Sequence, residues 1–226
     1  MQSILPTFYT KGAVVPYTER IGSSMRDLRS VILASASPRR YQLLTSLGLD
    51  VLVRPSGIDE GVRPGHGPLE LAALHAAGKA DAVARRERGG VIVAADTVVD
   101  LDGAALGKPV SAADAAATLR SLAGREHLVH TAYAVLDEAA GARIVGAVTT
   151  RVRFAALSDA AIEAYVATGD PFDKAGSYGI QGRGAALVER IEGDFYTVMG
   201  FPLGEFVRRL PELGYRLPAP QLAGTR

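Results

Sequence analysis

The chain has 226 residues, of which 48% are hydrophobic, enough for one large domain or two small ones with a sizeable buried core. Its 25 basic and 24 acidic residues nearly balance, which argues against a nucleic-acid-binding protein but leaves room for a small anionic ligand. The absence of cysteine excludes disulfides, zinc–thiolate sites, iron–sulfur clusters and cysteine nucleophiles.

Residues 1–29 contain prolines and glycines that interrupt any periodicity, which predicts an N-terminal extension, mobile or draped over the surface. Met25, shortly before the first strand, is a candidate start of translation. No basic region followed by an apolar core is present, and no apolar stretch reaches the roughly 18 residues that span a bilayer. The sequence therefore predicts a soluble cytoplasmic protein that does not bind membranes.

From residue 30 onward, apolar runs and amphipathic stretches predict strands mixed with helices. Strands are predicted at 31–33, 51–53, 91–95, 127–137, 143–154 and 187–191, and helices at 39–47, 69–88, 111–122, 158–169 and 203–210. The two runs 127–137 and 143–154 alternate apolar and polar residues and indicate antiparallel strands. The fold class is therefore α/β with a mixed sheet, in a domain of residues 30–212 followed by a tail of residues 213–226.

The stretch LASASPRR, 33–40, joins the first strand to the first helix through very small residues. Such a connection exposes backbone N–H groups next to a helix N-terminus, where the hydroxyls of Ser35 and Ser37 add hydrogen-bond donors for an anion. Arg39 and Arg40 suit phosphate oxygens, but adjacent helical residues lie about 100° apart, so the two side chains point in different directions. A plain strand–turn–helix with solvated arginines is the alternative.

Asp96 follows five apolar residues, so it is expected at the end of a buried strand. A carboxylate there is costly unless it binds a metal, pairs with a cation or handles protons. Lys108 can return to the same place across a hairpin; the alternatives are a turn residue and a surface charge.

Between Asp96 and Lys108, the residues Asp100-Leu101-Asp102-Gly103 resemble the nucleophile motif of haloacid dehalogenase-type phosphatases. The match is imperfect because Ala104 stands where those enzymes carry Thr or Val, and because their motif opens the fold. Asp102-Gly103 between two apolar runs is also the signature of a type I′ hairpin turn, which we favour.

The stretch 170–185 holds four glycines and a proline, which predicts an unusual backbone path that can approach a ligand closely. The amide of Gln181 can donate and accept hydrogen bonds and so match a pyrimidine edge, although a surface Ω-loop is as compatible with the pattern. Glu60, in a glycine- and proline-rich loop, offers oxygen ligands for Mg²⁺ or simply solvates the loop. No histidine pair has metal-ligand spacing.

Taken together, the motifs LASASPRR, IDE, AADTVV, GKP, DKAGSYGIQG and VERIEGDFYTVMGFPL resemble the Maf nucleotide pyrophosphatases, in order and spacing, over residues 31–210. The resemblance implies an elongated mixed sheet flanked by helices, as in inosine triphosphate pyrophosphatases, with the substrate in a central cleft, and a homodimer. It implies hydrolysis of a nucleoside triphosphate between the α- and β-phosphates with a divalent metal cation, Mg²⁺ or Mn²⁺. It also associates the chain with removal of modified nucleotides and with arrest of cell division.

The resemblance further assigns roles to individual residues. Asp96 would be the proton acceptor that activates water, and Glu60 with Asp96 would hold the metal. The residues that would bind phosphate are Ser35, Ser37, Arg40, Lys79 and Lys108. Those that would select dTTP and UTP are Arg39, Thr97 and Gln181. The alternatives are a phosphatase with Asp100 as nucleophile and a nucleotide-binding regulator without catalysis.

Overall fold

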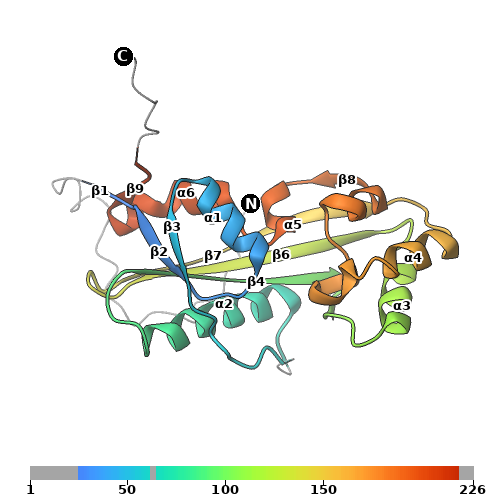
Figure 1. Cartoon of the computed structure of the whole chain (residues 1–226), viewed down its shortest axis with the longest axis horizontal. Helices are drawn as coiled ribbons and strands as arrows, with labels where there is room; N and C mark the ends of the chain where they lie inside the picture. Colours follow the sequence, from blue (N-terminus) through green and yellow to red (C-terminus); the bar gives the residue numbers. More distant parts are fainter. Residues whose placement is uncertain (1–24, 62–64, 219–226) are drawn as a thin grey trace, which may run out of the picture.

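The structure, a computed structural model, describes residues 25–61 and 65–218. At its centre lies a seven-stranded sheet with the order β3-β2-β4-β6-β7-β8, in which β5 also pairs with β4. Helix α2 lies along one face of this elongated sheet, α1 and α6 lie along the other, and α3 and α4 gather at one end (Figure 1). The architecture is therefore the predicted mixed α/β sheet flanked by helices.

The sheet strands are β2 (Ser30–Leu33), β3 (Asp50–Val53), β4 (Val91–Leu101), β5 (Ala104–Leu106), β6 (Glu126–Asp137), β7 (Ala142–Phe154) and β8 (Val188–Glu192). The helices are α1 (Pro38–Ser46), α2 (Pro68–Ala84), α3 (Ala112–Leu122), α4 (Asp159–Val166), α5 (Phe195–Met199) and α6 (Leu203–Arg209). Short 3₁₀ helices follow as η2 (Asp170–Asp173), η3 (Ala175–Ser177), η4 (Gly182–Leu187) and η5 (Leu210–Leu213). None of the helices within these described ranges is long and apolar enough to cross a membrane.

Every predicted helix and strand is present; two of their boundaries differ by more than three residues, and one short helix was not predicted. Helix α2 ends at Ala84 and not at residue 88, because the chain turns there toward Gly89 and Gly90, both of which have positive φ. Strand β4 continues six residues beyond Ala95, since β6 pairs with it as far as Asp100. The five-residue helix α5 was not predicted because it is too short to show a periodicity.

The β4–β5 connection is the hairpin that the sequence favours. Asp102 has φ 54° and Gly103 has φ 85°, which is the pair of positive φ angles that a type I′ turn requires. The Asp100 carboxylate accepts a hydrogen bond from the Gly103 amide at 2.7 Å and lies 3.2 Å from the His130 ring. Asp100 is therefore a turn-stabilising residue in this fold.

The edge of β4 changes neighbours part-way along its length. On one side β2 runs parallel to β4 only up to the pairing of Leu33 with Val93, and then the chain leaves for α1. Strand β5 takes the same side from Val99 onward. In the described part of the chain, the stretch 94–98 thus has no strand on this side, and this gap in the sheet contains Asp96.

Alternation along β4 decides which way its polar residues point. Val93 and Ala95 belong to the apolar cluster under α1 and α6, whereas Ile92 and Ala94 pack against α2. Successive side chains of a strand point to opposite faces. Asp96 therefore points toward α2, and Thr97 points toward α1 and α5.

The described parts of the predicted extension and tail are folded and pair with each other. Residues 1–24 and 219–226 lie outside the described residues. Strand β1 (Arg26–Asp27) runs parallel to β9 (Tyr215–Arg216), and Leu28 is buried. The Asp137 carboxylate accepts hydrogen bonds from Arg26 and Tyr215, which fastens both segments to the end of β6. Two-residue strands carry no periodicity that could have indicated this pairing.

Candidate active site

A cavity of about 620 Å³ lies at the gap beside β4. Its walls come from the β2–α1 connection, the loop after β3, helix α2, the segment after β5 and the 3₁₀-helical loop before β8. All ten residues to which the resemblance assigns a role line this cavity: Ser35, Ser37, Arg39, Arg40, Glu60, Lys79, Asp96, Thr97, Lys108 and Gln181. The fold thus brings together residues that lie up to 146 positions apart, from Ser35 to Gln181.

The connection from β2 to α1 forms as its sequence predicts. Ser37 is the N-cap of α1, and its hydroxyl accepts from the Arg40 amide, while Pro38 occupies the first helical turn, where its missing N–H is not needed. The hydroxyl of Ser35 accepts from the Ser37 amide at 3.2 Å and from Nη1 of Arg40 at 3.1 Å. Both hydroxyls keep their own proton for a further acceptor in the cavity.

The Arg40 guanidinium is held by a chain of hydrogen bonds. Its Nε donates to the Gly200 carbonyl at 2.9 Å, and its Nη2 donates to Thr97 Oγ1 at 3.2 Å. Thr131 Oγ1 donates to the Thr197 carbonyl and lies 2.9 Å from Thr97 Oγ1, so the proton of Thr97 is directed at Thr131. The Thr97 hydroxyl therefore fixes Arg40 and has no second proton to offer a ligand.

Arg39 and Arg40 diverge, as their adjacent positions on a helix predict. Arg39 Nη1 lies 2.9 Å from Oδ2 of Asp173, a residue of η2 that also lines the cavity. Asp173 also pairs with Lys174 at 2.6 Å. Burial raises the pKa of the Asp173 carboxyl, but hydrogen bonds from Lys174 and Arg39 outweigh it, so that this pKa lies below its usual value.

Two further residues of the cavity, Lys108 and Gln181, lie on loops. Gln181 is the exposed residue that precedes η4, and Lys108 is exposed in the segment after β5. The Gly176 amide donates to the Gly107 carbonyl at 3.0 Å, which ties the two loops together. Gly184 allows a second close approach, because a Cβ atom there would lie 1.9 Å from the Gly179 carbonyl oxygen.

Asp96 is the most buried carboxylate of the cavity, with 5% of its surface exposed. Its Oδ1 lies 2.6 Å from the Lys79 ammonium, which also contacts Oε1 of Glu60 at 3.0 Å and the Ala95 carbonyl at 3.4 Å. Burial raises the pKa of the Asp96 carboxyl, but the hydrogen bond to His75 and the charge of Lys79, among others, outweigh it and hold this pKa below its usual value. Asp96 is therefore an ionised carboxylate in a mostly apolar strand.

The placement of Asp96 corrects one expectation. It stands in the middle of β4, opposite Ala132 of β6, and not at the end of the strand. What ends near it is the parallel neighbour β2, so the cavity opens at an interruption of the sheet and not at the end of β4.

Sequence reasoning missed His75, which contacts the second oxygen of Asp96. Its Nδ1 lies 3.2 Å from Asp96 Oδ2, and the hydrogen bond to Asp96 raises the pKa of His75 despite the burial of the ring. His75 precedes Lys79 by four residues, so both side chains lie on the same face of α2. The spacing of four residues between His75 and Lys79 was the feature of the sequence that could have indicated His75.

Comparison with known proteins identifies the family. The sequence profile described as "Maf-like protein" matches residues 30–213. The chain belongs to the Maf family. The Maf domain is 44% identical, over 84% of this chain and 98% of the relative, to a "dTTP/UTP pyrophosphatase" of Dictyoglomus thermophilum. A protein of the same name from Geobacter sulfurreducens is 48% identical, over 81% of this chain and 96% of its own length.

A solved structure of a HAM1 protein from Coxiella burnetii is similar to part of this chain. The likeness has a TM-score of 0.38 at 18% identity, and it covers 56% of this chain and 73% of the HAM1 chain.

Proposed function

We propose that this protein hydrolyses dTTP and UTP between the α- and β-phosphates, releasing the nucleoside monophosphate and pyrophosphate. The observation that carries the proposal is the ionised Asp96 carboxylate, held by Lys79 at one wall of a cavity with several further cations. The names of the Dictyoglomus and Geobacter relatives support the reaction and its two substrates. The volume of about 620 Å³ lies within the usual range for small-molecule sites.

Asp96 acts as the general base that takes a proton from the attacking water. An ionised carboxylate is ready to accept a proton, and its burial keeps bulk water from competing. The attack forms a bond from the water oxygen to the α-phosphorus and breaks the bond to the bridging oxygen, so that pyrophosphate leaves. Asp100 is not suited to the alternative role of nucleophile, because its carboxylate is engaged by Gly103 and His130 away from this cavity.

The triphosphate is bound by cations and hydroxyls from three elements. Ser35, Ser37 and Arg40 approach from the β2–α1 connection, Lys79 from α2 and Lys108 from the segment after β5. Lys79 is engaged by Asp96, Glu60 and the Ala95 carbonyl, so a phosphate oxygen would replace one of them. Glu60 is the partner that yields, because 43% of its side chain is exposed.

Glu60 and Asp96 would hold a divalent cation, Mg²⁺ or Mn²⁺, whose chemistry is to offset phosphate charge and to lower the pKa of a bound water. The residues fit such an ion, since both carboxylates face the cavity and oxygen is the ligand that these metals prefer. Among the described residues, no group of three or more acidic, histidine or cysteine side chains could hold a metal alone. Phosphate oxygens and water would complete the coordination.

The charge of the cavity also supports a metal. Its lining carries five cationic side chains against four carboxylates, so its formal charge is only +1. A triphosphate carries several negative charges, and a divalent ion is often the largest local positive charge in a phosphate site. The protein alone would leave much of that charge unopposed.

The base is selected by Arg39, Thr97 and Gln181. Gln181 offers a donor and an acceptor at the exposed loop before η4, and Arg39 lines the same cavity, where it pairs with Asp173. Thr97 contributes through Arg40, since its hydroxyl is already engaged between Arg40 and Thr131. Removal of modified pyrimidine nucleotides from the cytoplasmic pool would be the cellular consequence.

The deciding experiment is a panel of nucleoside triphosphates incubated with Mg²⁺ or Mn²⁺, with pyrophosphate and orthophosphate measured separately. We expect pyrophosphate release from dTTP and UTP, with a loss of about a hundredfold or more in kcat for Asp96→Asn. Asp100→Asn is the matched control and should keep its activity. Orthophosphate as the product, or loss of activity only in the control, would refute the proposal, whereas tight UTP binding without turnover would indicate a regulator.

We also propose that the protein forms a homodimer. Phe195 and Tyr196, adjacent residues of α5, expose 40% and 43% of their surfaces, and exposed aromatic residues are common at protein interfaces. Light scattering after size-exclusion chromatography tests this: the wild type should have twice the monomer mass of 23.7 kDa, and Phe195→Asp should shift it toward the monomer.

A further inference from the structure

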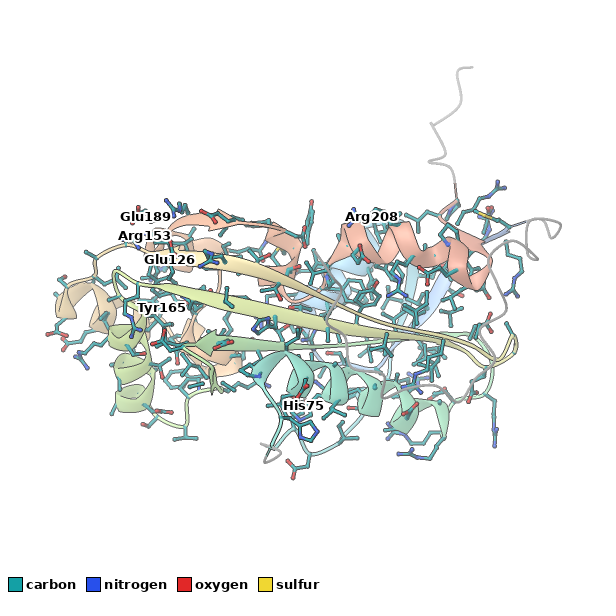
Figure 2. All side chains as sticks on the ribbon, turned by 180° about the vertical axis from the view of Figure 1, so that it is seen from behind. His75, Glu126, Arg153, Tyr165, Glu189 and Arg208 are labelled. Carbon is teal, nitrogen blue, oxygen red and sulfur yellow. The ribbon has the colours of Figure 1, made fainter. Side chains whose placement is uncertain are left out.

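His75 is a buried side chain with two polar contacts at the edge of the site. Only 3% of its surface is exposed, and the residues that line the cavity do not include it. Figure 2 shows it on α2, beneath the sheet. A residue in this position touches no substrate, so any effect on catalysis must pass through its neighbours.

The two ring nitrogens reach two different parts of the site. Nδ1 lies 3.2 Å from Asp96 Oδ2, and Nε2 lies 3.2 Å from the carbonyl oxygen of Gly61. Both partners accept hydrogen bonds, and an imidazole with a proton on each nitrogen donates to both. Gly61 directly follows Glu60, so the imidazole joins the middle of β4 to the loop that carries the second proposed metal ligand.

Lys79 makes the parallel connection one helical turn away. Its ammonium joins Asp96 Oδ1 to the Glu60 carboxylate, whereas His75 joins Asp96 Oδ2 to the backbone carbonyl of Gly61. Each oxygen of Asp96 is thus contacted from a different position of α2, which fixes the rotation of the carboxylate about its Cβ–Cγ bond. A carboxylate held at one oxygen only could turn.

We propose that His75 is a positioning residue for the reaction: it orients the Asp96 carboxylate through Nδ1 and holds the loop 55–61 against α2 through Nε2. The inference rests on the proposed role of Asp96 as the general base. Other contacts already hold parts of this loop, since Arg86 donates to the carbonyls of Pro55 and Ser56. The contact of His75 with Gly61 acts at the other end, beside Glu60.

Asparagine and glutamine separate the two contacts. The amide nitrogen of asparagine stands where Nδ1 of histidine stands, and that of glutamine reaches the place of Nε2. His75→Asn therefore keeps the hydrogen bond to Asp96 and loses the one to Gly61. His75→Gln keeps the hydrogen bond to Gly61 and loses the one to Asp96. His75→Leu loses both while still filling the apolar space.

The experiment measures kcat and KM for pyrophosphate release from UTP, and hydrogen exchange of the 55–61 segment without metal or nucleotide. We expect kcat to fall about tenfold to a hundredfold for His75→Leu, with KM changed by less than about threefold. For His75→Asn, kcat should lie within about threefold of the wild-type value, but the backbone amides of the 55–61 segment should exchange their hydrogens faster. His75→Gln should show the reverse, with wild-type exchange and a low kcat.

The outcomes are distinguishable from failure of the proposed function. If the wild type releases pyrophosphate and Asp96→Asn does not, a His75→Leu enzyme with full kcat overturns only the inference about His75. Equal kcat for the Asn and Gln variants also overturns it, even if His75→Leu does not fold. His130→Gln, which replaces another buried histidine outside the cavity, is the control and should retain kcat.

Discussion

His127 should make the folded protein sensitive to mild acid. The residue lies on β6 with 3% of its surface exposed, and the rings of Phe154 and Tyr178 lie against its own at centroid distances of 5.1 and 5.4 Å. Nε2 lies 2.7 Å from the Tyr178 hydroxyl, and Nδ1 is buried without a partner in the described part of the protein. Burial disfavours the charged ring and lowers the pKa of His127 from 6.5 to about 4.

The sign and size of the effect follow from this difference in pKa. The folded pKa lies below the unfolded value, so the unfolded chain takes up the proton first and stability falls as the pH drops below 6.5 toward 4. Between about pH 7.5 and about pH 5, protonation of the unfolded state alone should lower the free energy of unfolding by about 2 kcal/mol. Below pH 4 the loss should level off near 3 kcal/mol, which corresponds to the difference of about 2.5 units between the unfolded and folded pKa values.

Urea unfolding of the wild type and of His127→Gln at a series of pH values measures this loss. Glutamine keeps a hydrogen-bonding group near Tyr178 but does not titrate, so the free energy of unfolding of the variant should fall by about 2 kcal/mol less over the same range. Replacement of the exposed His66 by glutamine is the control and should leave the wild-type profile in place. Parallel pH profiles for the wild type and His127→Gln would refute the reasoning.

Three further substitutions test other parts of the structure. Gly184→Ala forces a Cβ against a backbone carbonyl and should cost about 3 kcal/mol or prevent folding, whereas Gly107→Ala, with open space around it, should be almost neutral in the same urea titration. Ser158→Ala removes the N-cap of α4 and should cost about 1 kcal/mol, most of which Ser158→Asp should restore. Thr97→Val releases Arg40 and should lower kcat/KM about tenfold for dTTP and UTP alike. A change in the ratio of the two values would show that Thr97 contacts the nucleoside, at its base or its sugar, and would contradict this reasoning.

The parts of the site that rest on local chemistry could be predicted from the sequence. Ser37 and Pro38 determine where α1 begins, because a cap and a proline act within one turn of the helix. The hairpin at Asp102-Gly103 was predictable for the same reason, since two residues with positive φ define it.

The position of Asp96 within its strand was not predictable in this way. A carboxylate in mid-strand is stable here because Lys79 and His75 reach it from α2, 17 and 21 residues earlier in the chain. The parallel neighbour β2 also ends three strand positions before Asp96, where Leu33 pairs with Val93. Both conditions depend on tertiary packing, which no window of the sequence around Asp96 contains.

The lengths of β6 and β7, 12 and 13 residues, have a consequence for motion. Both strands run through the apolar cluster around Phe201 and Phe206 and through the separate cluster around Phe154. The cavity walls are therefore supported by one sheet whose strands β6 and β7 run continuously through both clusters, so the sheet does not open or close them as a hinge between two domains would. Adjustment to a ligand has to come from side chains and from the loops at the rim, so the distances between β4, α1 and α2 are set before any ligand arrives.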